Sequence, residues 1–224
     1  MARSLKELNA EITRCRKCPR LAPYIRKVAR EKVRRFAGEK YWGRPVTGFG
    51  DFHARLLIVG LAPAAHGGNR TGRMFTGDSS GDWLARALHE NGFASKPTSL
   101  SSGDGLKLKD AYVTASARCA PPQNKPTREE LANCLPYLEE EVSILRDVQV
   151  VVCLGRIAFD TCCKLFGIRG AAFSHGHTFV HGSLTIICSY HPSRQNTQTG
   201  RLTWSQWLRI FAKARRILDS RPQD

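Results

Sequence analysis

Four cysteines have positions that suit a metal site. Cys15 and Cys18 form a Cys-x-x-Cys pair beside Pro19, and fourteen residues separate Cys119 from Cys134. A Cys-x-x-Cys turn lets two thiolates reach one metal centre. By count, four thiolates suit tetrahedral zinc and an iron–sulfur cluster equally well, and the spacing leaves both open. Burial without any metal is the third alternative.

The remaining four cysteines have apolar neighbours. Cys153 and Cys188 lie within apolar runs, and the adjacent Cys162 and Cys163 lie in a segment with a helical pattern. A free cysteine in such a place behaves as a small hydrophobic residue. We therefore expect these four side chains to be part of the core.

A segment of small residues could bind a ligand through its backbone. It follows the apolar run at 55–60 and consists of Gly60, Leu61, Ala62, Pro63 and Ala64. Small side chains let a ligand approach closely, so that exposed N–H groups can bind it.

Two further segments carry side chains that could do chemistry. Phe75 and Asp78 place an aromatic ring and a carboxylate three residues apart. The alternatives are a core phenylalanine and an aspartate that caps a helix. His191 brings an imidazole next to four polar or basic residues that could reach a phosphate backbone. These residues are Ser193, Arg194, Gln195 and Asn196.

Strand and helix patterns alternate along the chain. Short apolar runs predict strands at 55–60, 111–115, 148–154 and 184–189. Helical patterns follow at 79–92, from Thr127, at 156–166 and from Thr203. This alternation is typical of a three-layer α/β/α fold with a central, mainly parallel, four-stranded sheet. Ligand sites in such sheets form at the carboxyl ends of strands, where the loops after residues 60, 115 and 190 begin.

One of these helices carries both a start signal and a breaker. Thr127 and Glu130 have the spacing of a capping box. Pro136 lies a few residues further on, which predicts either a kink or a later start of the helix.

The chain is strongly basic. Its 35 Lys and Arg residues outnumber 19 Asp and Glu residues, for a formal net charge of +16. This imbalance attracts polyanions, with nucleic acid ahead of an anionic membrane. We interpret residues 1–224 as a single domain with a basic N-terminal segment, residues 1 to about 50, that carries the first cysteine pair.

The sequence predicts no membrane attachment. It contains no apolar run of about 18 residues, and residues 1–10 lack the apolar core of a secretory signal. We expect a monomer in the cytoplasm, where thiols stay reduced. Eight cysteines there need an explanation other than disulfides.

Several motifs occur together in a recognisable order. They are GLAPA from Gly60, TGRMFTGDSSG from Thr71, RCAPPQNKPT around Cys119 and HPSRQNTQTGRLT from His191, preceded by YWGRP from Tyr41. In this combination the chain resembles family 5 of the uracil-DNA glycosylase superfamily, over nearly its whole length. The resemblance implies that Cys15, Cys18, Cys119 and Cys134 bind a 4Fe–4S cluster, and it makes zinc the lesser alternative.

The resemblance also implies a reaction. A monofunctional DNA glycosylase hydrolyses the N-glycosidic bond of uracil and other deaminated bases after the base leaves the stack. Asp78 would orient the attacking water and stabilise the sugar cation, and His191 would donate to the developing anion on the base. Phe75 would stack on the base, and backbone N–H groups of residues 61–64 would add donors. Because no lysine nucleophile is implied, we expect no lyase activity.

Two positions depart from related patterns. Leu61 stands where family 4 carries an acidic residue, so the carboxylate role falls to Asp78. Ala115 stands where many relatives have an asparagine that contacts the base, which predicts looser base discrimination. Two other functions stay open: a non-catalytic, metal-bearing DNA-binding module, and an enzyme acting on free nucleotides. The second lacks a GxGxxG or Walker-type motif.

Overall fold

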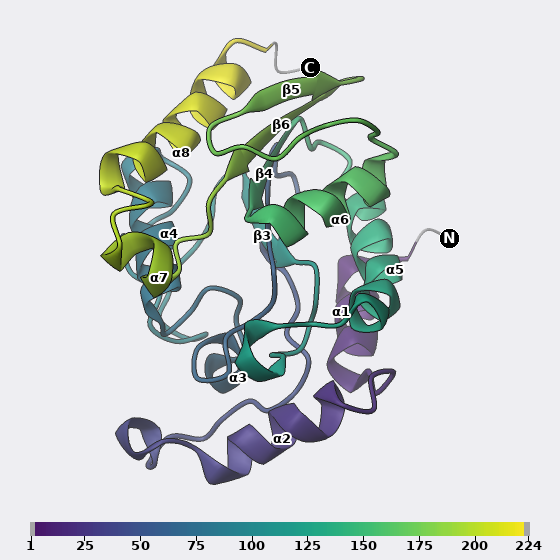
Figure 1. The fold of residues 1–224 in the computed structure, drawn as a ribbon, viewed down its shortest axis with the longest axis vertical. Coiled ribbons are helices and arrows are strands. Elements are labelled where there is room, and N and C mark those ends of the chain that lie inside the picture. Colours follow the sequence, from purple (N-terminus) through teal and green to yellow (C-terminus); the bar gives the residue numbers. More distant parts are fainter. Residues whose placement is uncertain (1–2, 222–224) are drawn as a thin grey trace.

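A six-stranded sheet forms the centre of the computed structural model, which describes residues 3–221 (Figure 1). The strands lie in the order β1-β3-β2-β4-β6-β5. Four of them are parallel to one another: β2 (Leu56–Gly60), β3 (Ala111–Ala115), β4 (Val150–Leu154) and β6 (Leu184–Ser189). These strands confirm the predicted ones.

The three-layer, mainly parallel architecture is confirmed, but the sheet has six strands instead of the four predicted. β1 (Phe49–Gly50) pairs antiparallel with β3, and β5 (Thr178–His181) pairs antiparallel with β6. β1 has only two residues, and the residues of β5 are partly or fully exposed. Neither edge strand has the continuous apolar run by which a buried strand is recognised.

Helices cover both faces of the sheet (Figure 1). The α-helices are α1 (Leu5–Arg14), α2 (Leu21–Glu31), α3 (Gly68–Thr71), α4 (Ser79–Glu90), α5 (Arg128–Ile144), α6 (Arg156–Phe166), α7 (Arg194–Gln198) and α8 (Trp204–Asp219), with 3-10 turns η1 (Arg34–Phe36) and η2 (Pro122–Asn124). α4 and α8 pack on one face, and α1, α5 and α6 pack on the other.

The two faces of β2 explain its uniformly apolar sequence. Successive residues of a strand point to opposite faces. Leu56 and Ile58 belong to the core that contains Trp207 of α8, whereas Leu57 and Val59 belong to the core beneath α5 and α6. A strand buried on both sides cannot alternate with polar residues, and β2 is buried along its whole length.

α5 starts where its sequence predicts. The Thr127 side chain accepts from the Glu130 N–H, and the Glu130 carboxylate accepts from the Thr127 N–H at 2.8 Å, which completes the capping box. The helix begins at Arg128 and continues through Pro136 to Ile144. The later start considered for this helix is therefore wrong.

A buried ion pair joins the loop after β3 to α5. The Arg118 guanidinium donates to the Glu141 carboxylate at 2.7 Å, and neither side chain is more than 1% exposed. Thr114 and Tyr112 of β3 also donate to this carboxylate, at 2.6 and 3.2 Å. Buried charges need such partners. This network fixes the chain just ahead of Cys119 against the helix that carries Cys134.

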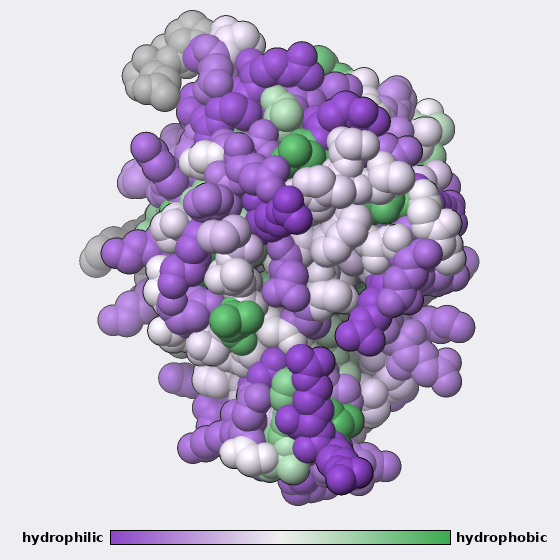
Figure 2. All heavy atoms as spheres, turned by 90° about the vertical axis from the view of Figure 1, so that its left-hand side faces the viewer, coloured by the Kyte–Doolittle hydropathy of each residue, from purple (hydrophilic) through white to green (hydrophobic). Residues whose placement is uncertain are grey.

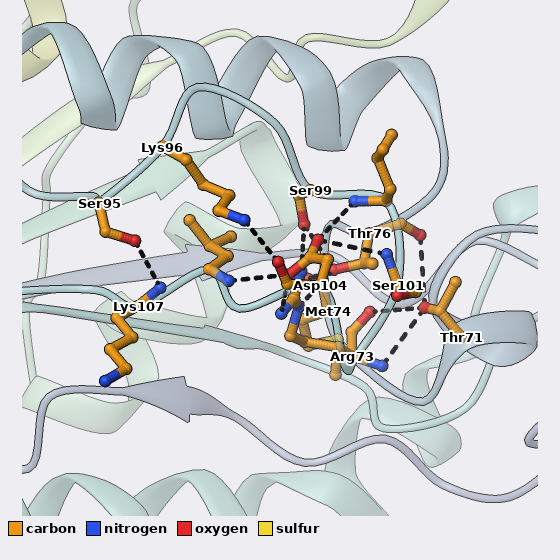
Figure 3. A network of polar contacts seen from close by, with 12 residues as sticks. Thr71, Arg73, Met74, Thr76, Ser95, Lys96, Ser99, Ser101, Asp104 and Lys107 are labelled. Carbon is orange, nitrogen blue, oxygen red and sulfur yellow. Dashed lines mark hydrogen bonds and ion pairs between the residues drawn. The ribbon is translucent and has the colours of Figure 1, made fainter.

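A second network braces the loop ahead of α4 (Figure 3). Buried Arg73 donates to Asp104 at 2.8 Å, to Ser99 at 3.0 Å and to Thr76 at 2.9 Å. The Asp104 carboxylate also accepts three backbone N–H bonds within the turn around it. Burial acts to raise the pKa of Asp104, but the bonds from Arg73 and the backbone outweigh it and hold the pKa well below its usual range.

The surface beside α4 and α8 is mainly hydrophilic. Figure 2 shows hydrophobic side chains on this face as separate spots among polar and charged ones. Among residues 3–221, none of the helices combines the length and the apolar composition needed to cross a membrane.

We predict that Asp104→Asn lowers the free energy of unfolding by about 3 kcal/mol at pH 7, because it leaves Arg73 buried without its counter-charge. Since the folded-state pKa of Asp104 is depressed, its contribution is present above the ordinary aspartate pKa of about 3.9 and is lost as the pH falls below it. The stability gap between wild type and variant should therefore be constant from about pH 7 to pH 5 and should shrink in stronger acid.

Urea denaturation at several pH values measures this gap. Asp219→Asn is the matched control, because the Asp219 side chain is 59% exposed in its ion pair with Arg215. That variant should cost less than about 1 kcal/mol. A gap for Asp104→Asn no larger than that of the control would contradict the role assigned to the Arg73 network.

Candidate active site

A cavity of about 730 Å³ opens at the carboxyl ends of the parallel strands. Its position confirms that the loops after β2, β3 and β6 converge there. Ten of the residues predicted for a site line it: Leu61, Ala62, Pro63, Ala64, Phe75, Asp78, His191, Ser193, Arg194 and Gln195.

Three predicted residues lie beside the cavity and do not line it. Gly60 and Ala115 are paired in register at the ends of β2 and β3, and Ala115 is buried in the core. A Cβ added at Gly60 would lie 2.7 Å from the Phe75 ring, so glycine leaves the room in which that ring packs. The Asn196 amide donates to the His191 carbonyl at 2.8 Å and so holds the loop that carries the imidazole.

Asp78 both caps α4 and faces the cavity. Its Oδ1 accepts from the Gly81 N–H at 2.9 Å, which is the capping role considered from the sequence. Its Oδ2 lies against Gly67, where an added Cβ would be only 1.9 Å away. Burial raises the pKa of Asp78, and the N–H groups of Gly81 and Ser80 oppose this rise. The capping bond occupies one carboxylate oxygen and leaves Oδ2 for chemistry.

Phe75 and His191 form one wall of the cavity. Their ring centroids are 5.7 Å apart, with 32° between the ring planes. Phe75 has a positive φ of 48°, which a non-glycine residue adopts at a cost of about 1 kcal/mol or more. Backbone strain of this kind persists where the surroundings hold it. Two rings at this angle provide a surface on which a planar heterocycle can stack.

The loop that carries His191 is tied to α4, and the imidazole lines the cavity in a partly buried position. Ser80 of α4 donates to the Pro192 carbonyl at 3.0 Å, which ties this loop to the helix that Asp78 caps. Burial lowers the pKa of His191 to about 4. The side chain is therefore neutral at pH 7 and can donate through one ring nitrogen without carrying a charge.

The cavity also has walls that the sequence did not reveal. Gln123 and Asn124, both with positive φ, project from the loop after β3, and Gly155 and Arg156 begin α6 directly after β4. The strand–glycine–helix junction at Gly155 is a signal that could have been used, because every parallel strand ends at this edge. Gln123 and Asn124 belong to the RCAPPQNKPT motif quoted for the family resemblance, so that motif was a second signal that could have been used.

A second cavity, of about 540 Å³, lies beside the first. Asp78 and Asn124 line both. Its other walls include Arg35 and Phe36 of η1 and Arg70 of α3. The Asp78 carboxylate thus lies at the boundary of the two cavities, and Arg35 of the basic N-terminal segment lines the second one.

The four cysteines predicted to bind metal line one small cavity of their own. Cys15 follows α1, Cys18 precedes α2, Cys119 follows β3, and Cys134 lies in α5. Burial raises the pKa of Cys119, and the other three cysteines add to this rise because their thiolates would repel its charge. Four thiolates in one buried space therefore need a positively charged centre.

The donor set does not converge on a single point. Among residues 3–221, no three or more His, Cys, Asp or Glu side chains are arranged to hold one metal ion. What the structure brings together is four thiols in one buried cavity.

We predict that His191 titrates near its lowered pKa of about 4 and stays neutral from pH 6 to pH 8. NMR titration of ¹⁵N-labelled histidines measures this, and His191→Gln identifies the signal by its loss. Because the unfolded chain binds this proton at about pH 6.5, folding stability should fall as the pH drops from there to about 4. A titration midpoint near 6.5 would contradict a desolvated imidazole.

Known proteins match the chain over most of its length. A model of the uracil DNA glycosylase superfamily matches residues 47–215. Type-5 uracil-DNA glycosylase from Thermus thermophilus is 53% identical, covering 92% of this chain and 94% of the relative, and the type-5 enzyme of Mycobacterium leprae is 48% identical, covering 96% of each.

Pyrobaculum aerophilum has enzymes of both types, so the two types can be compared within one organism. Its type-5 uracil-DNA glycosylase is 45% identical over 91% of this chain and 88% of the relative, whereas its type-4 enzyme is 29% identical over 84% and 83%. The difference in identity therefore follows the type of enzyme and not the organism. The chain belongs to the uracil-DNA glycosylase superfamily, and within it to type 5.

Proposed function

We propose that this chain is a monofunctional uracil-DNA glycosylase, which hydrolyses the N-glycosidic bond of uracil and other deaminated bases in DNA and leaves an abasic site. One observation carries the proposal: in a chain of this superfamily, Asp78, Phe75 and His191 line the same cavity at the carboxyl edge of the sheet. Together they offer a stacking surface, a neutral donor and a carboxylate.

The base enters the cavity only after it has left the DNA stack. Stacking on Phe75 contributes about 1–3 kcal/mol to holding it there. The neutral His191 imidazole donates to the oxygen of the base on which negative charge develops, and backbone N–H groups of residues 61–64 add further donors. These donors are most effective in the transition state, since the leaving base is then an anion.

Asp78 acts on the sugar side of the bond. Its free oxygen orients the attacking water and, while ionised, stabilises positive charge on the sugar. Asn124 lines the same two cavities, so its side-chain amide is placed to share that water. Lysine is not required, because water attacks the anomeric carbon directly.

Cys15, Cys18, Cys119 and Cys134 would hold a 4Fe–4S cluster. The shared buried cavity and the repulsion among its four thiols support a metal centre there, and membership of type 5 supports a cluster over zinc. When bound, the cluster supplies covalent ties between the N-terminal segment and the sheet. The residues of the reaction itself lie elsewhere, around Asp78.

A DNA substrate accounts for the strongly basic composition of the chain. Phosphates attract the formal net charge of +16, and Arg194 at the rim of the cavity is placed to meet them. We propose that the protein acts as a monomer on chromosomal DNA in the cytoplasm. The broad base range rests on Ala115, whose small side chain offers no amide to a base.

We predict that Asp78→Asn lowers the single-turnover rate of uracil release by about a hundredfold or more, while the Kd for DNA changes little. Asparagine retains the capping bond to Gly81, so the variant should fold as stably as wild type to within about 0.5 kcal/mol. A uracil-containing oligonucleotide, cut at abasic sites after the reaction, gives the rate.

Glu90→Gln is the matched control, because Glu90 lies at the opposite end of the same helix, where its carboxylate pairs with Arg86. It should release uracil at close to the wild-type rate. Near-normal turnover by Asp78→Asn would remove the carboxylate from the mechanism. A wild-type protein that binds the oligonucleotide but never releases uracil would instead indicate a non-catalytic DNA-binding module.

We predict that the protein purified without oxygen contains iron and sulfide and absorbs visible light, which a zinc site with its filled d shell does not. Cys134→Ser should lose iron and lower the unfolding midpoint, since one tie between α5 and the N-terminal segment is broken. Cys163→Ser, which changes a half-buried cysteine of α6, should retain the full iron content. Stoichiometric zinc without iron would overturn the assignment.

A further inference from the structure

Arg70 is a buried charged residue that the proposed reaction does not use. It lies on the short helix α3 and is only 7% exposed. Its Nε donates to the His66 carbonyl at 2.7 Å, and its Nη2 donates to the Gly77 carbonyl at 2.9 Å. Burying a guanidinium is costly, so these contacts must hold it firmly.

The first set of contacts acts on the peptide that leads into Asp78. Gly77 has a φ of 75°, and a Cβ added there would lie 2.3 Å from Nη2 of Arg70. The guanidinium therefore lies directly on the backbone of Gly77, and its hydrogen bond fixes the carbonyl one residue before Asp78. A displacement of this peptide would also move the carboxylate.

The second set of contacts reaches the basic N-terminal segment. The Phe36 ring of η1 lies 3.8 Å from the guanidinium carbon, and the Glu39 carboxylate forms an ion pair with Nη1. Arg34 and Arg35 of the same turn are exposed, and Arg35 lines the second cavity together with Asp78. One side chain thus connects the segment at 34–39 with the peptide ahead of the carboxylate.

Resting on the function proposed above, we propose that Arg70 is a positioning residue. It couples the position of the segment at 34–39 to the orientation of the Asp78 carboxylate. When exposed arginines of this segment meet DNA phosphates, the segment is held in place. Phe36 and Glu39 then hold the guanidinium, and the guanidinium holds Gly77. DNA contact some distance from the reacting bond thereby favours the productive position of the carboxylate.

Arg73 shows why this connection is not merely a packing contact of the loop. Arg73 is just as buried as Arg70 and lies three residues after it. Its partners Asp104 and Ser99, however, belong to the segment that follows α4 in the sequence (Figure 3). Arg70 contacts Phe36 and Glu39 of the segment at 34–39, whereas the ring that lies against Arg73 is Phe49 of β1. The charge of Arg70 also opposes the rise that burial causes in the pKa of Asp78.

The test measures single-turnover uracil release at saturating DNA together with Kd. We expect Arg70→Lys to lower the rate by about tenfold or more, because lysine keeps the charge but cannot span both partners. Glu39→Gln and Phe36→Leu touch neither Asp78 nor the base, yet they should lower the rate in the same direction, by about threefold. The Kd of all three should stay within about threefold of wild type.

A double-mutant cycle separates positioning from general loosening of the fold. In the Asp78→Asn background, Arg70→Lys should cause almost no further loss of rate, because it acts only through the carboxylate. Arg55→Lys is the control: Arg55 is a part-buried arginine paired with Asp110 and remote from the site. It should lower the unfolding midpoint and leave the rate unchanged.

Three outcomes would overturn the proposal. They are a folded Arg70→Lys variant with a near-normal rate, a loss that adds in full to that of Asp78→Asn, and an equal loss of rate in Arg55→Lys. Uracil release by the wild-type protein is measured in the same series. The glycosylase assignment therefore stands or fails independently of the positioning role.

Discussion

The structure around the candidate site depends on how one carboxylate, Asp78, is buried at the start of α4. Burial raises the pKa of Asp78 and so favours its neutral form. The opposing interactions are short and local: N–H bonds at the start of α4, the positive end of that helix, and the charge of Arg70. These donors limit the rise in the pKa and so reduce the cost of the ionised form at this place.

This arrangement accounts for the glycines of the loop. A Cβ at Gly67 would lie 1.9 Å from Oδ2 of Asp78, and one at Gly81 would lie 2.3 Å from the Phe75 carbonyl. Glycine at these positions lets backbone pack against the carboxylate and against the strained Phe75 peptide. The close packing that requires glycine at these positions is therefore also what buries part of the carboxylate. The loop is stabilised instead by the hydrogen bonds and ion pairs of Arg70 and Arg73.

The sequence was informative wherever a pattern reports on one element at a time. The buried strands, the capping box at Thr127, and the polar loops at the carboxyl edge all follow from local periodicity and from the topology of a parallel sheet. The shared cavity of Cys15, Cys18, Cys119 and Cys134 was also foreseeable, although spacing could not choose between zinc and a cluster. The edge strands β1 and β5 were not, because a short or half-exposed strand lacks the apolar run.

The sequence did not predict contacts between segments that are far apart along the chain. Nothing in the motif around Arg70 indicates that its guanidinium packs on Phe36, thirty-four positions earlier, since arginine in a glycine-rich loop suggests a solvent-exposed or phosphate-binding side chain. Likewise, Asn124 lines the same cavities as Asp78 only because of the tertiary course of the loop after β3. Long side chains reach several ångströms from their own backbone, so periodicity cannot locate their partners.

The two attachments of the N-terminal segment complete this account. The segment is tied to the sheet side of the molecule at Cys15 and Cys18, which lie against Cys119 and α5, and again at Phe36 and Glu39, which lie against Arg70. α2, with its exposed basic residues, runs between these attachments. A chain fixed at both ends loses less conformational freedom when it binds a phosphate backbone than a free arm would. The cysteine cavity at the first attachment and Arg70 at the second therefore hold the basic surface of α2 at a fixed position relative to the Asp78 carboxylate.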